Sequence, residues 1–277
     1  MTTIRTLLSK TSTNLLPRLE IEILLCHVLG VTRSYLLAWS EKNLTAKQYS
    51  QFQTLLARRV QGEPIAYITG YKEFWSLYLQ VTENTLIPRP ETELLVEQAL
   101  ARLSPDCRVI DLGTGSGAIA LAIAHECPQC SVLATDKSIA ALNVARANAQ
   151  RLGLHQVQFL VSDWCSALGD IKAELIVSNP PYVAIADPHL KGEVRYEPPC
   201  ALVAGKDGLA DIRRLVADSQ SHLVPRGWLL LEHGYDQAEA VRALFEQHAY
   251  EAITTYQDLA GLPRVTVGQK MPVTGLD

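Results

Sequence analysis

The spacing of apolar residues is helical over the first quarter of the chain and changes near residue 70. Apolar residues recur there three and four positions apart, as expected for the buried face of an amphipathic helix. The two clearest stripes are Ile21, Leu24, Leu25, Val28 and Leu29, followed by Phe52, Leu55, Leu56 and Val60. Pro17 and Gly30 suit the ends of the first helix, and Thr45 suits the N-cap of the second. This segment is therefore predicted to form a small helical bundle.

A different pattern begins at Cys107, where short apolar runs alternate with longer amphipathic stretches. Strands are expected near residues 107–112, 131–136, 156–161, 173–178 and 227–232. Helices are expected near residues 117–126, 138–151, 208–222 and 236–247. A terminal hairpin is expected at about 250–257 and 263–269, because Gly261 and Pro263 lie between these runs. The alternation is typical of an α/β fold with a parallel sheet and helices on both faces.

The segment between these regions contains alternating apolar and polar residues. Residues 74–82 are predicted to form a strand, with residues 81–86 returning as its hairpin partner. The stretch 87–93 contains two prolines and leads into a helix that ends near Leu103. We therefore expect three parts, which are a helical domain (1–71), a β-hairpin linker (72–90) and the α/β domain (91–277).

Composition and charge narrow the class of protein. Of the 277 residues, 48% are apolar and 19% are charged, as in an ordinary globular protein. The net charge of −4 argues against a nucleic-acid partner, because such proteins usually carry a basic face. No apolar run approaches the roughly 20 residues that cross a bilayer, and the N-terminus lacks the core of a signal peptide. We expect a cytoplasmic protein, monomeric and without a membrane partner.

Six cysteines are scattered along the chain, which argues against a disulfide framework. Cys127 and Cys130 form a C-x-x-C pair close to His125. A structural zinc site needs four ligands, usually from two such clusters, and the sequence has no second cluster. We therefore expect buried thiols and no metal, and a redox role for the pair stays open.

A glycine-rich turn follows the first strand of the α/β region and opens its first helix. It reads Asp111-Leu112-Gly113-Thr114-Gly115-Ser116-Gly117, and its glycines let a ligand approach the backbone closely. This G-x-G-x-G spacing differs from the G-x-G-x-x-G of pyrophosphate sites, and the acid Asp111 disfavours a pyrophosphate. Asp136 ends the second strand, where its carboxylate can accept hydrogen bonds from both hydroxyls of a ribose. A nucleoside with a cationic amino-acid group fits both acids, and S-adenosylmethionine is such a ligand. A structural turn is the alternative.

Two further side chains follow the third strand. Asp163 can accept a hydrogen bond from the amine of an adenine, and Trp164 offers a flat apolar wall. The alternative is a surface aspartate beside a core tryptophan.

The tetrad Asn179-Pro180-Pro181-Tyr182 follows a buried apolar run and marks the expected site of chemistry. A residue before proline is held extended, and proline has no N–H, so carbonyl groups and the Asn179 amide point outward from a stiff backbone. Such a cradle suits a planar NH2 group. Asn-Pro and Pro-Pro also occur in plain turns that end a strand, which is the alternative.

Seven segments together carry a family resemblance, and they are residues 62–66, 73–75, 86–90, 111–117, 179–182, 194–198 and 232–234. Through them the chain resembles the protein-(glutamine-N5) methyltransferases that act on the Gly-Gly-Gln glutamine of class 1 peptide chain release factors. The resemblance implies a helical N-terminal domain that docks the release factor and a seven-stranded class I methyltransferase domain dependent on S-adenosylmethionine. It also implies that the cofactor is held by Gly113, Thr114, Gly115, Ser116, Gly117, Asp136, Trp164 and Asn179, and the glutamine by residues 179–182.

The expected mechanism relies on orientation, because an amide nitrogen is a poor nucleophile. The Asn179 side-chain oxygen and the Pro180 carbonyl would each accept one N–H of the substrate amide. Tyr182 and Phe74 would pack against the glutamine, unless both are core aromatics, and Arg89 with Glu197 could organise the pocket.

Three alternatives stay open at this point. The same cradle would suit adenine N6 in a nucleic-acid methyltransferase. The glutamine of ribosomal protein L3 is a second possible acceptor, although the stretch 187–209 resembles the release-factor enzyme more than its relative that acts on L3. A binding module without catalysis is the third.

Overall fold

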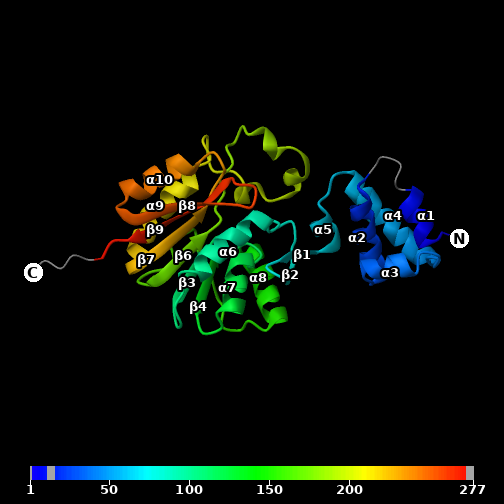
Figure 1. Cartoon of the computed structure of the whole chain (residues 1–277), viewed down its shortest axis with the longest axis horizontal. Helices are drawn as coiled ribbons and strands as arrows, with labels where there is room; N and C mark the ends of the chain where they lie inside the picture. Colours follow the sequence, from blue (N-terminus) through cyan, green and yellow to red (C-terminus); the bar gives the residue numbers. More distant parts are fainter. Residues whose placement is uncertain (1, 11–15, 273–277) are drawn as a thin grey trace, which may run out of the picture. The chain divides into compact units, whose positions relative to one another are not determined.

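The computed structural model describes residues 2–10 and 16–272. The chain forms two compact units, Met1–Tyr71 and Lys72–Asp277. Figure 1 shows the elements of each unit with their labels. No helix among the described residues is long and apolar enough to cross a membrane.

The first unit is a bundle of short helices. Its helices are α1 (Ile4–Lys10), α2 (Arg18–Leu29), α3 (Arg33–Ala38), α4 (Ala46–Val60) and α5 (Ile65–Thr69). Both predicted stripes supply its core, where Leu24, Leu25 and Phe52 are fully buried. The predicted N-cap at Thr45 is confirmed, because its hydroxyl accepts from the Gln48 amide while the Gln48 side chain accepts from the Thr45 amide.

A two-stranded hairpin, β1 (Tyr71–Phe74) and β2 (Leu77–Gln80), precedes the large sheet. The prediction of one strand over residues 74–82 was wrong, because the chain turns at Trp75 and Ser76. Both residues have positive φ angles, 51° and 59°, which is the geometry of the tightest hairpin turns. Residues 81–89 continue as a loop rather than as a returning strand.

The second unit is a sheet of seven strands in the order β5-β4-β3-β6-β7-β9-β8. These strands are β3 (Arg108–Leu112), β4 (Ser131–Asp136), β5 (Gln158–Val161), β6 (Ala173–Ser178), β7 (Leu223–Glu232), β8 (Tyr250–Gln257) and β9 (Pro263–Lys270). The first five are parallel to one another, and β9 runs antiparallel to both β7 and β8. The expected seven-stranded α/β fold is confirmed.

Helices cover both faces of this sheet (Figure 1). They are α6 (Glu93–Leu100), α7 (Ala118–Glu126), α8 (Ile139–Leu152), α9 (Ala210–His222) and α10 (Ala238–Gln247). Val109 and Leu175 pack in one core cluster with α6 and α7, whereas Ile110 and Ile176 pack in a second cluster with α9 and α10. Neighbouring residues on a strand therefore belong to opposite layers, as the period of a strand requires.

Strand β7 begins earlier than the predicted residue 227. Pro225 and Gly227 lie within the strand, in an irregular stretch where Arg226 has a φ of 63°. The register with β6 shifts at this point, between the pairs Ala173–Leu223 and Leu175–Trp228. A bulge of this kind absorbs residues that a regular strand would exclude.

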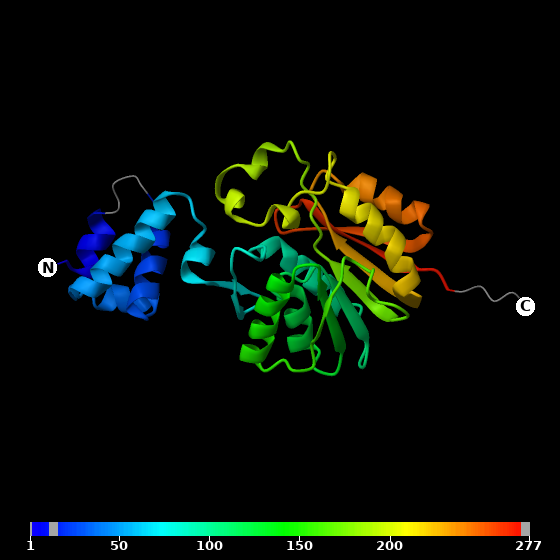
Figure 2. The ribbon, with the colours of Figure 1, turned by 180° about the vertical axis from the view of Figure 1, so that it is seen from behind.

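The order of the strands fixes where a ligand can enter. From β3 the chain adds β4 and β5 on one side and then returns to place β6 on the other side of β3. A crevice forms at such a switch point, outside the carboxyl ends of the strands. The 3-10 turns Pro90–Thr92, Pro188–Leu190, Gly192–Tyr196 and Pro199–Ala201 lie in the segments before α6 and between β6 and α9. Figure 2 shows the second of these segments in yellow-green, as an irregular excursion beyond the strand ends.

Candidate functional site

A cavity of about 270 Å³ opens at the carboxyl ends of the parallel strands of the second unit. Segments after β3, β4, β5 and β6 contribute to its walls, together with residues before α6 and near the last 3-10 turn. The predicted site residues that line it are Gly113, Thr114, Gly115, Ser116, Asp136, Asp163, Trp164, Asn179 and Pro181. The structure therefore brings together, around one cavity, predicted site residues that are up to 68 positions apart.

Trp164 forms a wall that is packed directly on the glycine-rich turn. Its indole nitrogen donates a hydrogen bond to Asp211 Oδ1 at 2.9 Å, which fixes the ring. A Cβ on Gly113 would lie 3.0 Å from that ring, and Gly113 has a φ of 80°. Only glycine combines this backbone conformation with so close a contact. Asp163 also lines the cavity, but its half-exposed carboxylate pairs with Arg214 at 3.1 Å.

Asp136 connects two loops at the rim of the cavity. Its Oδ2 accepts from the Gly115 amide at 2.9 Å, and its Oδ1 accepts from the Ser138 amide at 2.8 Å. A carboxylate oxygen can accept a second hydrogen bond, so both oxygens keep capacity for the hydroxyls of a ribose. The predicted position of an acceptor at the end of β4 agrees with this geometry.

Asp111 does not reach the cavity, in contrast to the direct cofactor contact expected from the sequence. Its side chain is fully buried, where its Oδ2 accepts from the Thr114 hydroxyl at 2.6 Å and from the Ala120 amide at 3.2 Å. Burial raises the pKa of Asp111 to about 7. Through these two hydrogen bonds Asp111 connects the glycine-rich turn to the first turn of α7. Gly117 lies outside the lining as well, at the N-cap of α7.

Asn179 presents one side of its amide to a neighbouring hydroxyl. Its Nδ2 donates to Thr92 Oγ1 at 3.1 Å, and Thr92 itself is buried and lines the cavity. Neither the Asn179 side-chain oxygen nor the Pro180 carbonyl accepts a hydrogen bond from the part of the chain that the structure describes. Two acceptors are thus left on a stiff backbone, as the tetrad predicted.

Tyr182 is partly buried and does not line the cavity. Its hydroxyl donates to Glu232 Oε1 at 3.3 Å, and its carbonyl accepts from Gln237 Nε2 at 3.0 Å. Gly208 packs against the same carbonyl so closely that a Cβ there would lie 2.2 Å from the oxygen. The backbone of the tetrad is therefore held from behind by the segment that enters α9.

Glu232 and Thr92 are polar residues of the site that sequence reasoning did not single out. Glu232 ends β7 and is buried, which raises its pKa to about 7. A signal existed, because the segment 232–234 carries part of the family resemblance and an acid ends a buried strand there. Thr92 gave no such signal.

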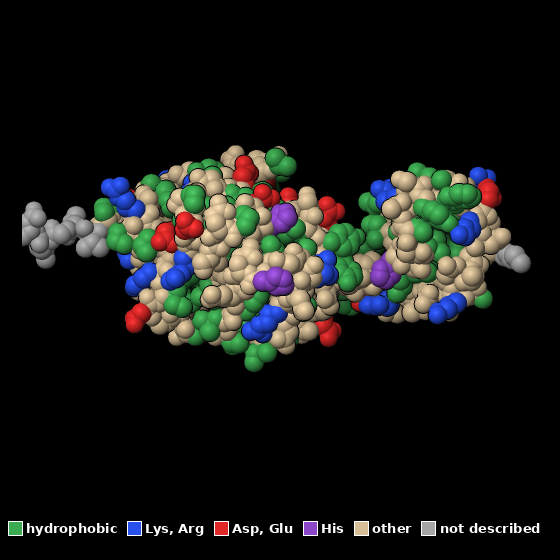
Figure 3. Space-filling view, turned by 90° about the horizontal axis from the view of Figure 1, so that it is seen from below, with side chains coloured by type: hydrophobic (Ala, Val, Ile, Leu, Met, Phe, Trp, Pro, Cys, Tyr) green, Lys and Arg blue, Asp and Glu red, His purple; other side chains and the backbone are tan. Residues whose placement is uncertain are grey.

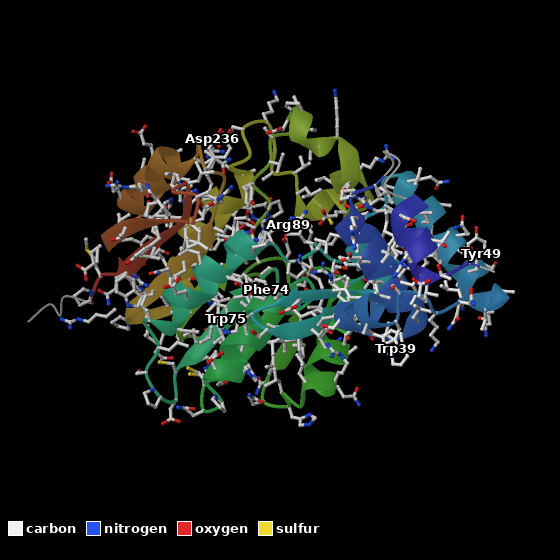
Figure 4. The ribbon with its side chains drawn as sticks, turned by 45° about the vertical axis from the view of Figure 1, so that its right-hand side comes forward. Trp39, Tyr49, Phe74, Trp75, Arg89 and Asp236 are labelled. Carbon is white, nitrogen blue, oxygen red and sulfur yellow. The ribbon has the colours of Figure 1, made fainter. Side chains whose placement is uncertain are left out.

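Two predicted substrate contacts need correction, and Figure 4 labels both residues. Phe74 is 2% exposed and belongs to the core between the hairpin and the sheet, so it is not a wall of the site. Arg89 is absent from the cavity lining and pairs with Glu197, which also accepts from the Ile87 amide at 3.0 Å. This ion pair fixes the loop before α6, which does line the cavity.

Among the described residues, no group of three or more potential ligands is arranged to hold a metal ion. Cys130 is buried, and burial raises the pKa of its thiol to about 11. A thiol in this state is a poor nucleophile at neutral pH.

Comparison with known proteins identifies the family. Residues 5–70 match the family described as the PrmC N-terminal domain, and residues 90–191 match the Methyltransferase small domain. The "Release factor glutamine methyltransferase" of Salmonella typhimurium is 52% identical over 258 residues, which cover 92% of this chain and 93% of that protein. The chain belongs to the release factor glutamine methyltransferase family.

Solved structures support the same fold for this member of the release factor glutamine methyltransferase family. A methyltransferase from Pyrococcus furiosus aligns with a TM-score of 0.56 at 19% identity, over 79% of this chain and 99% of its own. The 16S rRNA N2 G1207 methyltransferase of T. Thermophilus, in complex with AdoMet and guanosine, aligns with a TM-score of 0.52 at 21% identity, over 72% of this chain and 49% of its own. At such identities the likeness concerns the class I methyltransferase fold alone.

Proposed function

We propose that this protein transfers a methyl group from S-adenosylmethionine to the side-chain amide nitrogen of the glutamine in the Gly-Gly-Gln motif of class 1 peptide chain release factors. One observation carries the proposal. The side-chain nitrogen of Asn179 donates a hydrogen bond to Thr92 Oγ1. The Asn179 side-chain oxygen and the Pro180 carbonyl therefore remain as two acceptors for one NH2 group. The name borne by relatives at 52% identity supplies the substrate that this geometry does not specify.

The donor set of the cavity fits S-adenosylmethionine. Asp136 would bind the ribose hydroxyls, Trp164 would flank the adenine, and Asp163 would accept from its amine. No atom lies within 4 Å of the position that a Cβ on Gly115 would take, so the remaining part of the ligand would lie next to the backbone there. A fold neighbour solved with AdoMet supports this choice.

Positioning is the main contribution of the protein to catalysis. The cofactor supplies a methyl group on a positively charged sulfur, which needs no further activation. Asn179 and Pro180 would each accept one hydrogen of the substrate amide, so that the nitrogen lone pair would lie along the direction of attack. The methylated nitrogen would then lose one of these hydrogens as a proton to water, and S-adenosylhomocysteine would leave. Alignment of this kind contributes up to roughly 7 to 11 kcal/mol in well-oriented reactions. Pro181 narrows the cavity and helps to exclude water.

The helical domain, residues 1–71, is proposed to dock the release factor, and residues 72–90 to form the hairpin linker to the methyltransferase domain, residues 91–277. Leu37 and Trp39 support a docking role, since they are 66% and 60% exposed although both are apolar. Figure 4 shows Trp39 at the surface of its helices. Such side chains are enriched in protein interfaces. We also propose that the protein is cytoplasmic and monomeric.

Methylation of adenine is a weaker candidate, although the same two acceptors would suit it. The net charge of the chain is −4. On the face drawn in Figure 3, basic and acidic side chains are interspersed rather than gathered into a basic stripe. A nucleic-acid substrate would require such a stripe for affinity.

A labelling experiment tests the proposal. The protein is incubated with labelled S-adenosylmethionine and unmethylated release factor, ribosomal protein L3 or DNA, and the label is located by mass spectrometry. Label on the Gly-Gly-Gln glutamine is expected. Asn179→Ala should abolish this transfer and leave weakened but measurable cofactor binding. Label on DNA or L3 alone, or wild-type turnover by Asn179→Ala, would refute the assignment.

A further inference from the structure

Glu232, Thr92 and Asn179 are neighbouring polar side chains, and the first two are buried. Ser178 pairs with Leu231 in the parallel register of β6 and β7, so Asn179 and Glu232 follow neighbouring positions at the carboxyl ends of adjacent strands. Thr92 Oγ1 accepts from Asn179 Nδ2 at 3.1 Å, and the Thr92 hydroxyl is near enough to the Glu232 carboxylate to lower its pKa without forming a well-aligned hydrogen bond to it. Thr92 and Glu232 are 3% and 1% exposed, so water does not compete for these bonds.

The donor and acceptor properties of these three side chains determine the direction in which the hydrogen bonds between them point. An amide NH2 can only donate, a hydroxyl has one hydrogen, and an ionised carboxylate can only accept. Glu232 Oε1 already accepts from Tyr182, whereas Oε2 has no well-formed hydrogen bond among the described residues. The Thr92 hydrogen can rotate toward that carboxylate, because Thr92 Oγ1 serves Asn179 as an acceptor. Every hydrogen bond then points toward Glu232.

We propose that Glu232 is a positioning residue whose negative charge fixes the direction of these hydrogen bonds and so keeps the Asn179 side-chain oxygen turned toward the substrate amide. The inference rests on the proposed function and deepens it. A neutral group at position 232 can donate to Thr92, and Thr92 can then donate to Asn179. The Asn179 amide is thereby free to flip, and it would present NH2 to the NH2 of the substrate.

The charges around Glu232 place its titration near neutral pH. Burial raises its pKa to about 7, whereas the nearby Thr92 hydroxyl, the hydrogen bond from Tyr182 and the charge of Arg264 on β9 oppose this rise. Glu91, next to Thr92, adds to it. The folded protein therefore holds a proton on Glu232 below about pH 7 and loses it above, so the productive orientation of Asn179 becomes more populated as pH increases.

The test compares Glu232→Gln with the wild type in the complete chain, with unmethylated release factor and S-adenosylmethionine as substrates. We expect kcat to fall at least about tenfold at high pH, since loss of alignment acts on turnover, while the cofactor Kd stays within about twofold. Wild-type kcat should rise with pH through about 7, and this rise should be absent in the variant.

Control variants separate positioning from a structural effect. Glu93→Gln makes the same change one residue after Thr92, at a carboxylate that accepts from the Trp75 amide at 2.8 Å, and it should keep the wild-type rate and pH profile. Thr92→Val removes the relay without touching Glu232 and should lose turnover, and Thr92→Ser should restore most of it. These two variants decide the matter if Glu232→Gln does not fold.

The outcomes distinguish a failure of the proposed function from a failure of the inference about Glu232. A wild-type protein that transfers no methyl group to the release factor overturns the proposed function, and this inference with it. A wild-type protein that is active, together with Glu232→Gln or Thr92→Val variants that keep its rate and pH profile, overturns the inference alone. Equal losses in Glu232→Gln and Glu93→Gln would do the same.

Discussion

The contact between Gly208 and Tyr182 predicts that a single methyl group behind the tetrad will reduce turnover. A Cβ on Gly208 would lie 2.2 Å from the Tyr182 carbonyl oxygen, and real Cβ contacts stay beyond 3.0 Å, so Gly208→Ala must move the backbone by about 0.8 Å. Neither atom can swing aside, because the oxygen belongs to the main chain. A misplacement of about 1 Å can lower a rate about 100-fold when catalysis depends on orientation.

Gly205 provides a matched control in the same segment. Gly205 and Gly208 have φ angles of 76° and 74°, so alanine at either position adopts a left-handed conformation that costs roughly 1 to 2 kcal/mol. Both variants should therefore lower the melting temperature by roughly 2 to 8 °C. At Gly205 the nearest atom is the Ala210 Cβ at 3.3 Å, so the tetrad stays in place.

The assay measures methyl transfer to unmethylated release factor at saturating cofactor, together with thermal unfolding of each variant. We expect Gly208→Ala to lose roughly 10- to 100-fold in kcat, whereas Gly205→Ala stays close to the wild type. Equal turnover in the two variants would show that the position of the Tyr182 carbonyl does not matter for the reaction.

Two further predictions concern the acids of the cofactor region. Asp136→Ala should raise the Kd of S-adenosylmethionine about 10- to 100-fold, because charge-assisted hydrogen bonds contribute roughly 1.5 to 3 kcal/mol, and unchanged binding by calorimetry would reject it as the ribose acceptor. Asp111 has a folded pKa of about 7, above the usual 3.8, so the folded state binds its proton more tightly and stability falls as pH rises between these values. Asp111→Asn stays neutral and should show a smaller decrease in melting temperature from about pH 5 to 8, and a decrease as large as that of the wild type would contradict the buried acid.

Features set by neighbouring residues were predictable from the sequence. The cap at Thr45, the strands that end at Asp136 and Ser178, and the turn at Gly113 follow from local spacing. The position of Asp111 was predictable in principle as well. Ile110 and Leu112 pack in the cluster with α9 and α10, so the residue between them must point to the opposite layer, under α7.

Features set by distant residues could not be read in this way. Asn179 and its partner Thr92 are 87 positions apart, and no pattern in either segment announces the other. The hairpin turn at Trp75 and Ser76 lacks the Asn-Gly signature that such turns usually carry, so packing of Phe74 and Leu77 in the core must select it. The same burial explains why Phe74 is a core residue and not part of the site.

The position of β9 in the sheet affects how the protein folds during its synthesis. β9 is made after β8, yet it lies between β7 and β8, where Val265 pairs with Glu232. A nascent chain that lacks residues 263–270 has an open edge on β7, the strand that carries Glu232, and open edges invite pairing with other chains. A protein proposed to act on the factors that release finished polypeptides therefore completes the seven-stranded sheet only when β9 has left the ribosome.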